Sequence, residues 1–327
     1  MNYFIRKATP DDIRPALDLA YRVFEVFEAP DYEPEALQHF REDIVENRAF
    51  ADAVASGENA MFLAFTEDIL VGIAASRGAA HLSILFVEST YHRHGIGTAL
   101  MNRMVCELKL RGSEQITLNS SPFGLPFYKH FGFIPTDVEQ KRDGFLFTPM
   151  VYTPNEIWDV LDKDRNQTGR FAERDRALPP DDYHLVVNIW KYNKRGEWLI
   201  DKRAPRGQKL DGKWETTGGS AVAGDSSLEA ALRETREELG IELDPQAGVL
   251  FHSDSMVAED GHGWHRDAWV FEANIPIETI RLQEGETCEA KWATTDEIRE
   301  MMKSGDFLGE YFYPYFEEMV EKWSRVC

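Results

Sequence analysis

Residues 219–241 read GSAVAGDSSLEAALRETREELGI, and this stretch decides the fold of the second half of the chain. Ser226 and Glu229 have the spacing of a capping box, in which each side chain bonds the other residue's backbone amide and a helix begins. Gly240 suits the C-terminal cap of that helix, because glycine readily adopts the left-handed backbone that ends many helices. The sequence therefore predicts a helix over residues 227–239.

Three glutamates share one face of this predicted helix. Glu234 and Glu238 are four residues apart and Glu237 is three from Glu234, so all three reach a common point. Like charges at this spacing repel unless a cation lies between them, and hard divalent ions such as Mg²⁺ prefer oxygen ligands. The preceding pair, Gly218 and Gly219, permits a tight turn whose carbonyls can face the same ion. A solvated acidic helix face is the alternative for such a cluster taken alone.

The complete pattern resembles the signature of the Nudix family: glycine, five residues, Glu, seven residues, then Arg-Glu-aliphatic-x-Glu-Glu-x-Gly-aliphatic. Asp225 stands in place of Glu, and Thr235 in place of the aliphatic residue. The resemblance implies an α/β/α sandwich that hydrolyses a small-molecule diphosphate, nucleoside-linked or another organic diphosphate, with Mg²⁺ or Mn²⁺ activating the attacking water. It also implies that the metal is held by Gly219, Glu234, Glu237 and Glu238, with the three glutamates acting in catalysis.

Two further residues take roles from this resemblance. Arg233 is expected to orient the glutamates through ion pairs, and Glu286 lies where many members carry one more acid, as a metal ligand or base. A surface charge beside a strand is an equal alternative for Glu286. Residues 212–219 resemble the branch similar to isopentenyl-diphosphate isomerase, whose chemistry uses a cysteine upstream of the signature. Since no cysteine lies between Cys106 and Cys288, we expect hydrolysis rather than isomerisation.

A second motif, HRHGIGTA at residues 92–99, follows a predicted strand over 81–87 and opens a predicted helix over 95–110. Two glycines allow the backbone to approach a ligand closely, and the free amides of a helix's first turn bind anions. One arginine and two histidines add local positive charge. A glycine pair alone also fits any strand-to-helix turn.

This segment resembles motif A of the GNAT acyltransferases, Arg/Gln-x-x-Gly-x-Gly/Ala, and residues 119–133 resemble the family's late strand and helix. The resemblance covers about residues 3–152. It implies a mixed sheet with helices that binds acetyl-CoA and transfers the acetyl group to a small amine. The implied coenzyme-binding residues are Phe86, Val87, His92, Arg93, His94, Gly95, Ile96, Gly97, Thr98 and Asn119.

Tyr128 matches the family's tyrosine that protonates the departing thiolate, a general-acid role. Packing beside Phe127 and Phe131 is the alternative for this side chain. The general base is left open between Glu88, His81 and a chain of waters.

Composition sets the frame for both motifs. A chain of 327 residues with 43% hydrophobic residues is long for one core and suits two domains, which we place at residues 1–152 and 153–327. The net charge of −21 argues against a nucleic-acid partner and against an anionic membrane surface. The three cysteines, Cys106, Cys288 and Cys327, show no paired spacing, and no long apolar run or signal segment is present. A cytoplasmic protein is therefore expected.

Local patterns predict the remaining elements. In the first half we expect a strand at 3–7, a helix from about residue 11, one amphipathic helix over 34–54, a hairpin of 61–66 with 70–77, a strand at 115–119, a helix at 122–131 and a strand at 144–150. Residues 154–180 are expected to form a polar connection with a turn at 162–166. In the second half we expect strands at 184–191, 197–201, 249–253 and 268–273, and two closing helices.

The sequence thus predicts an α/β protein made of two α+β domains, a GNAT-like domain followed by a Nudix sandwich. The leading hypothesis is a bifunctional enzyme with both activities. The alternative treats the first half as a non-catalytic, acetyl-CoA-binding regulatory module, and a weaker one makes the whole chain a sensor that binds without cleaving. The Nudix substrate, the acetyl acceptor and the oligomeric state stay open.

Overall fold

The computed structural model describes residues 2–207, 209–259 and 261–323. The chain divides into two compact units, each with its own sheet. The first unit runs to Ile157 and includes Glu173–Asp175, and the second holds Trp158–Ala172 and the chain from Arg176 onward. The predicted α/β class with two mixed domains is confirmed.

The first unit is built on one twisted sheet in the order β1-β2-β3-β4-β5-β8-β6, with β7 paired to β8. Every pairing is antiparallel except that of β4 with β5, which is parallel. Its strands are β1 (Phe4–Lys7), β2 (Met61–Thr66), β3 (Ile69–Arg77), β4 (His81–Val87), β5 (Ile116–Ser120), β6 (Ile134–Pro135), β7 (Gln140–Arg142) and β8 (Phe145–Tyr152).

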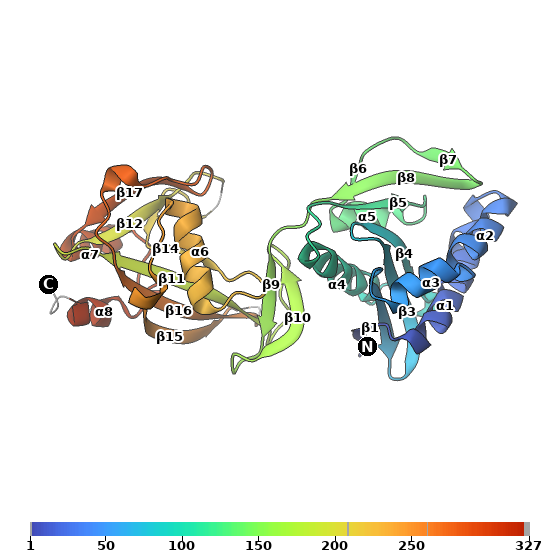
Figure 1. Ribbon diagram of the computed structural model, residues 1–327, viewed down its shortest axis with the longest axis horizontal. Helices are drawn as coiled ribbons and strands as arrows, with labels where there is room; N and C mark the ends of the chain where they lie inside the picture. Colours follow the sequence, from blue (N-terminus) through green and yellow to red (C-terminus); the bar gives the residue numbers. More distant parts are fainter. Residues whose placement is uncertain (1, 208, 260, 324–327) are drawn as a thin grey trace. The chain divides into compact units, whose positions relative to one another are not determined.

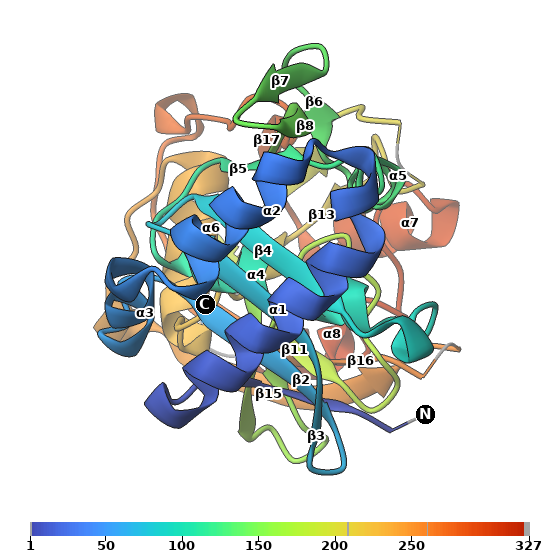
Figure 2. The ribbon, with the colours of Figure 1, turned by 90° about the vertical axis from the view of Figure 1, so that its right-hand side faces the viewer.

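Helices cover both faces of this sheet. Its helices are α1 (Ile13–Phe27), α2 (Pro34–Phe40), α3 (Arg48–Ala55), α4 (Ile96–Leu110) and α5 (Leu125–Phe131). Because strand side chains alternate between faces, Leu63 joins the core under α1 while its neighbour Ala64 joins the core under α4. Figure 2 shows α1 and α2 lying over one face of the strands, with α4 behind them.

The single helix predicted over residues 34–54 is wrong. The segment consists of α2, a π-helical turn at Arg41–Val45 and the separate α3. The Asn47 side chain accepts a hydrogen bond from Phe50 N at 3.0 Å and so begins α3. Asparagine favours such a cap, and this local bond competes with a continuous helix.

The second unit has a sheet in the order β10-β9-β11-β12-β13, to which β14, β15, β16 and β17 add. The long central strands β11 and β16 are parallel, and β15 is antiparallel to β16. Its strands are β9 (Ile157–Leu161), β10 (Gln167–Glu173), β11 (Tyr183–Tyr192), β12 (Trp198–Arg203), β13 (Trp214–Glu215), β14 (Thr217–Ser220), β15 (Val249–Val257), β16 (Gly263–Glu272) and β17 (Thr287–Ala293).

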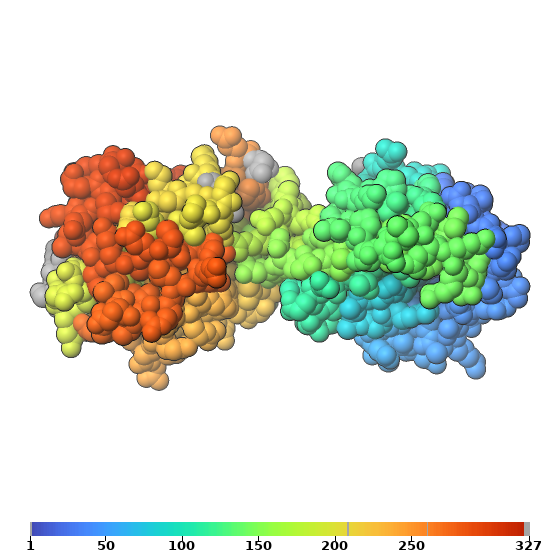
Figure 3. All heavy atoms as spheres, turned by 90° about the horizontal axis from the view of Figure 1, so that it is seen from above, coloured from blue at the N-terminus to red at the C-terminus, as the bar shows by residue number. Residues whose placement is uncertain are grey.

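Three helices enclose this sheet: α6 (Ser227–Leu239), α7 (Thr295–Ser304) and α8 (Phe316–Trp323). Ile189 of β11 faces the core under α6, and the next residue, Trp190, faces the core formed with α7 and α8. Figure 1 shows α6 lying across β11 and β14. Figure 3 shows the yellow part of the chain, near residue 200, beside the orange-red part toward the C-terminus. In agreement, Trp214 N donates to Asp306 O at 2.8 Å.

The polar connection predicted over residues 154–180 is partly wrong, because β9 and β10 form a hairpin there. The predicted turn at residues 162–166 is confirmed: Asp162 Oδ1 accepts the backbone amides of Asp164 and Asn166 at 2.8 and 2.9 Å. Strand β17 is likewise absent from the predicted elements. Cys327 lies outside the described residues. Within the described chain, the helices are too short or too polar to cross a bilayer.

Candidate active sites

The carboxylate-bearing helix α6 begins and ends as the sequence predicts. Ser226 Oγ accepts from Glu229 N at 3.3 Å, and Glu229 accepts from Ser226 N at 2.8 Å, which completes the capping box. Gly240 ends the helix with φ of +66°, a conformation that glycine adopts without steric cost. The cap fixes the rotation of the helix, so the glutamates face a defined direction.

Arg233 makes the expected ion pairs with the acids around it. Its Nε lies 2.9 Å from Asp225, and Nη1 lies 2.9 Å from Glu234 and 3.1 Å from Glu237. Nη2 also donates to Ser220 O at 3.0 Å. Asp225, although shorter than the glutamate of the signature, therefore still reaches the arginine. Arg233 ties the start of α6 to β14 and holds two of the glutamates.

Gly219 lies against the carboxylate of Glu234. A Cβ on Gly219 would fall 2.3 Å from Glu234 Cδ and about as close to both carboxylate oxygens. Any side chain at position 219 would therefore have to displace Glu234, which is itself buried. The carboxylate of Glu234 can lie this close to the backbone of β14 only because residue 219 is glycine.

Glu238 faces the interior of the unit, where further acids surround it. Burial raises the pKa of Glu238 well above its ordinary value, and the negative charges of Asp201, Glu234 and Glu215 raise it further. Burial likewise raises the pKa of Glu215 to about 8, with Asp201 adding to the effect. The excess of carboxylates here makes the site attractive to a cation.

A buried lysine lies beneath the same acids. Burial lowers the pKa of Lys191 to about 8, while Asp201 and Glu238 oppose that change. Lys191 Nζ donates to Thr217 Oγ1 at 2.5 Å, and Thr217 Oγ1 donates to Asp201 Oδ2 at 2.5 Å. Nothing in the pattern of strand residues predicts this chain of contacts.

The other two predicted site residues lie further out. Glu237 has a side chain that is 43% exposed and turned to Arg233. Glu286, in the loop before β17, forms an ion pair with Arg206 at 2.5 Å. Among the described residues, no three His, Cys, Asp or Glu side chains already converge on one metal position. The donors present are all carboxylate and carbonyl oxygens, the ligands that Mg²⁺ and Mn²⁺ prefer, so the residues fit a hard divalent ion.

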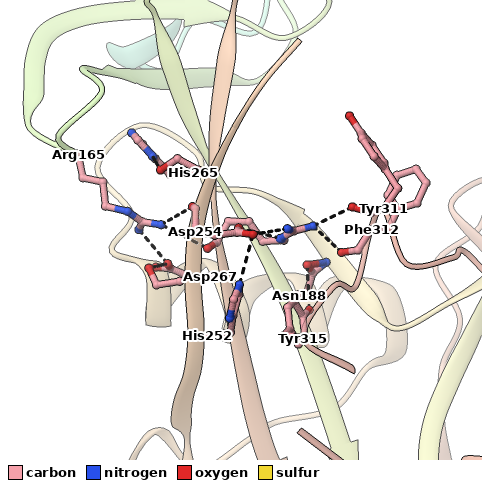
Figure 4. Close-up of polar contacts among 12 residues, drawn as sticks. Arg165, Asn188, His252, Asp254, His265, Asp267, Tyr311, Phe312 and Tyr315 are labelled. Carbon is pink, nitrogen blue, oxygen red and sulfur yellow. Dashed lines mark hydrogen bonds and ion pairs between the residues drawn. The ribbon is translucent and has the colours of Figure 1, made fainter. Parts of the chain in front are cut away.

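A second polar cluster in this unit, drawn in Figure 4, has an evident structural role. Arg266 is buried and pairs with Asp254 through Nε at 3.0 Å, and its Nη1 donates to Phe312 O at 2.6 Å. Arg165 Nη1 pairs with Asp267 at 2.8 Å. These charges satisfy one another and fasten the C-terminal segment to β15 and β16.

The glycine turn of the first unit has the backbone that anion binding requires. Gly95 precedes α4 with φ of +81°, and Arg93 has φ of +64°. The amides of Ile96, Gly97 and Thr98 belong to the first turn of α4, where backbone N–H groups have no partner within the helix. Arg93 is exposed beside them. These groups can bind a phosphate through the helix N-terminus.

The two histidines of the motif are engaged locally. His92 Nε2 donates to Val87 O at 2.8 Å, and its ring packs on Phe27 with centroids 5.1 Å apart. His94 Nδ1 donates to His92 O at 2.8 Å. These bonds shape the turn itself. Arg93 is exposed, and unlike the two histidines it makes none of the described hydrogen bonds within the turn.

The parallel strands β4 and β5 separate soon after they begin. Their register holds only His81 with Thr117 and Leu82 with Leu118. Beyond that point, Phe86 belongs to the core under α1 and Val87 packs on the core under α4. The divergence opens the sheet between the strands, next to the glycine turn.

A cavity of about 630 Å³ lies beside this opening, with Leu82, Phe86, Asn119, Ser121 and Tyr128 in its lining. Burial raises the pKa of Tyr128 above its ordinary value, and the nearby charge of Glu28 raises it further. A Cβ on Gly124 would lie 3.0 Å from Tyr128 Cε2, so the ring packs tightly on this turn. Tyr128 is thus held neutral at the edge of the cavity.

The structure separates the candidate bases. Glu88 pairs with Arg22 at 2.8 Å and is not among the residues lining the cavity. His81 does line it, and burial lowers the pKa of its ring. Sequence reasoning missed Glu28, which accepts from Ser121 Oγ at 2.8 Å and lines the cavity. No sequence signal marks Glu28, because its partner lies 93 positions along the chain.

Comparison with known protein families gives a match within each unit. Residues 28–154 match the acetyltransferase (GNAT) domain, and residues 182–316 match the NUDIX domain. An uncharacterized Nudix hydrolase of Listeria monocytogenes is 32% identical over 161 residues, covering 48% of this chain and 90% of that protein. An isopentenyl-diphosphate Delta-isomerase of Escherichia coli is 33% identical over 67 residues, 20% of this chain and 37% of that enzyme. Among solved structures, the PaiA N-acetyltransferase of Thermoplasma acidophilum, in complex with coenzyme A, is 21% identical, with a TM-score of 0.40 over 47% of this chain and 99% of that one.

Proposed function

Because the chain belongs to the Nudix hydrolase family and carries a GNAT acetyltransferase domain before the Nudix domain, we propose that it is a bifunctional enzyme. We assign acetyl transfer to residues 1–152 and diphosphate hydrolysis to residues 153–327. Among the described residues, Cys106 and Cys288 are not joined in a disulfide, which suits a reducing compartment and a cytoplasmic location.

For the Nudix domain we propose metal-dependent hydrolysis of an organic diphosphate. The observation that carries this function is the contact of Gly219 with Glu234 beside the partly buried Glu238. When bound, Mg²⁺ or Mn²⁺ would lower the pKa of a coordinated water and neutralise diphosphate charge. Glu234, Glu238 and the Gly219 carbonyl would hold the ion, Glu237 would join them by turning from Arg233, and Arg233 would orient the set.

Gly219→Ala is expected to lower hydrolysis about 10²-fold, since its Cβ displaces Glu234 and a shift of roughly 1 Å at a catalytic group costs about that much. The measurement is phosphate release with Mg²⁺ over a panel of nucleotide-linked and other organic diphosphates. Gly309→Ala is the matched control, because nothing lies within 4 Å of a Cβ there. Equal rates for both variants would remove the contact with Glu234 from the mechanism.

For the GNAT domain we propose acetyl transfer from acetyl-CoA to a small amine. Support comes from the divergence of β4 and β5 beside a cavity that Tyr128 lines. Acetyl-CoA supplies the activated acetyl group as a thioester. The amides of the α4 first turn would hold its phosphates, and the neutral Tyr128 hydroxyl would donate a proton to the departing sulfur.

Tyr128→Phe separates this function from a regulatory module that only binds the coenzyme. The variant lacks the donated proton but keeps the ring that packs on Gly124, so we expect acetyl transfer to fall about 10²-fold with coenzyme A affinity unchanged. Calorimetry with coenzyme A and a thiol-release assay measure the two quantities. If the wild type binds acetyl-CoA but releases no thiol with any amine present, the first domain is a regulatory module that only binds the coenzyme.

A further inference from the structure

One end of the cavity in the first unit holds a carboxylate among hydroxyl groups. Glu28 follows the last residue of α1, and Tyr32 lies four residues further along. Ser121, just after β5, donates to Glu28 Oε1 at 2.8 Å, and Tyr128 of α5 lines the same cavity. Two segments far apart in sequence, residues 28–32 and 121–128, thus bring one acid and three hydroxyls together.

The carboxylate of Glu28 is not neutralised by a basic side chain in these contacts. Burial raises its pKa to about 7 and the charge of Asp31 raises it further, while hydrogen bonds from Ser121 and Tyr32 lower it. Both arginines in the cavity lining have contacts with groups other than Glu28. Arg77 donates to Asp43 O at 3.2 Å, and Arg142 stacks over Phe147 at 5.6 Å. A ligand with a positive charge would supply what Glu28 lacks.

Another part of the cavity wall consists of aromatic rings, beside polar and charged residues that include His39, Asp43 and Asp143. The ring of Phe24 stacks on Phe40 with centroids 4.1 Å apart, and both present edges to Phe86, at 6.4 and 5.9 Å. Phe145 lies 6.2 Å from Phe24, and Phe147 also lines the cavity. Because the rings pack on one another, they form a fixed apolar surface that favours a flat, apolar group.

We propose that the acetyl acceptor is a primary amine joined by a short chain to an aromatic ring. Its ammonium group pairs with Glu28, and its ring lies against the phenylalanines. This assignment rests on the proposed acetyl transfer and names the substrate class of that site. Glu28 is then the proton acceptor, in place of Glu88 and His81.

The proton balance of the reaction follows from this placement. The bound ammonium gives one proton to the Glu28 carboxylate, and the free amine attacks the thioester carbonyl. The new C–N bond forms and the C–S bond breaks. Tyr128 gives its hydroxyl proton to sulfur, and the second proton lost by nitrogen replaces it on the Tyr128 oxygen. The products are an amide, a thiol and one proton, which leaves Glu28 to solvent.

Glu28→Gln is expected to lower kcat/KM for 2-phenylethylamine about 10²-fold, since the amide neither pairs with the ammonium nor accepts its proton. The wild-type pH profile should rise through about pH 7 as Glu28 loses its proton, and this limb should vanish in the variant. Glu25→Gln, at an exposed position in α1 three residues before Glu28, is the matched control and should behave as wild type. Butylamine should react more slowly than 2-phenylethylamine, because it lacks the ring.

Direct binding distinguishes failure of this inference from failure of the acetyl-transfer function. Calorimetry with coenzyme A present should show 2-phenylethylamine binding to the full chain, weakened in Glu28→Gln, and no binding of 2-phenylethanol. Binding of this kind without thiol release would leave the amine site intact and refute acetyl transfer. Transfer to amines with no preference for the ring and no effect of Glu28→Gln would refute the inference while acetyl transfer stands.

Discussion

Glu238→Gln is expected to lower diphosphate hydrolysis about 10³-fold. A bound metal contributes several kcal/mol of transition-state stabilisation, and about 1.4 kcal/mol corresponds to a tenfold change in rate. Glutamine keeps the shape of the side chain but removes one of the charges that would hold the ion. The measurement is the initial rate of phosphate release at saturating Mg²⁺, on the best substrate from a diphosphate panel.

The same variant should not unfold the domain. Burial and the neighbouring Asp201, Glu234 and Glu215 raise the pKa of Glu238, so its ionised form adds no stability to the fold when no metal is bound. Thermal unfolding in a chelator is therefore expected at or above the wild-type temperature. Glu242→Gln, at an exposed position just beyond α6, is the control and should change neither quantity. Unchanged turnover in Glu238→Gln would exclude Glu238 from metal binding.

The sequence predicted the elements that carry strong local signals. The capping box at Ser226 and the glycine at position 240 bound α6 at both ends, and the structure places the helix at Ser227–Leu239, as predicted. The strand predicted over residues 81–87 is likewise β4. In both cases the residues that set the boundaries of the element lie within or next to it in the sequence. The element can therefore be predicted without knowing its contacts with distant parts of the chain.

Elements defined by distant contacts were beyond such reasoning. The hairpin of β9 and β10 is rich in polar residues, and β9 becomes a strand by burying Ile157, Val160 and Leu161. The apolar spacing over residues 34–54 continues through the break at Asn47, so it reads as one helix. A hydrophobic pattern reports which face is buried and does not reveal where the backbone turns.

The candidate sites divide in the same way. The glutamates of α6 belong to one short motif, whereas Lys191, Asp201 and Glu215 meet Glu238 from three strands whose order the sequence does not state. Glu28 belongs to the second group, because only the folded sheet brings it to Ser121. Motifs thus identify site residues that are close in sequence. The neighbours that shift the pKa values of those residues come from distant strands and are known only from the fold.

Gly97→Val is expected to abolish coenzyme A binding, with no detectable heat at millimolar ligand. A Cβ on Gly97 would lie 3.6 Å from Phe127 Cε2 and 4.0 Å from Val87 Cγ2, which are ordinary contacts. Alanine therefore fits, while the two further methyl groups of valine must occupy the space in front of the first-turn amides of α4. An anion bound by those amides would lose its place.

Two milder variants test this explanation of coenzyme A binding. Gly97→Ala should bind coenzyme A nearly as well as the wild type, and Arg93→Ala should bind only modestly more weakly, because the backbone amides survive a side-chain change. Thermal unfolding of Gly97→Val checks that the fold persists, as expected because valine has a higher helix propensity than the glycine it replaces. Equal affinity of Gly97→Val and the wild type would mean that the glycine turn only connects β4 to α4, and that the coenzyme, if bound, lies elsewhere.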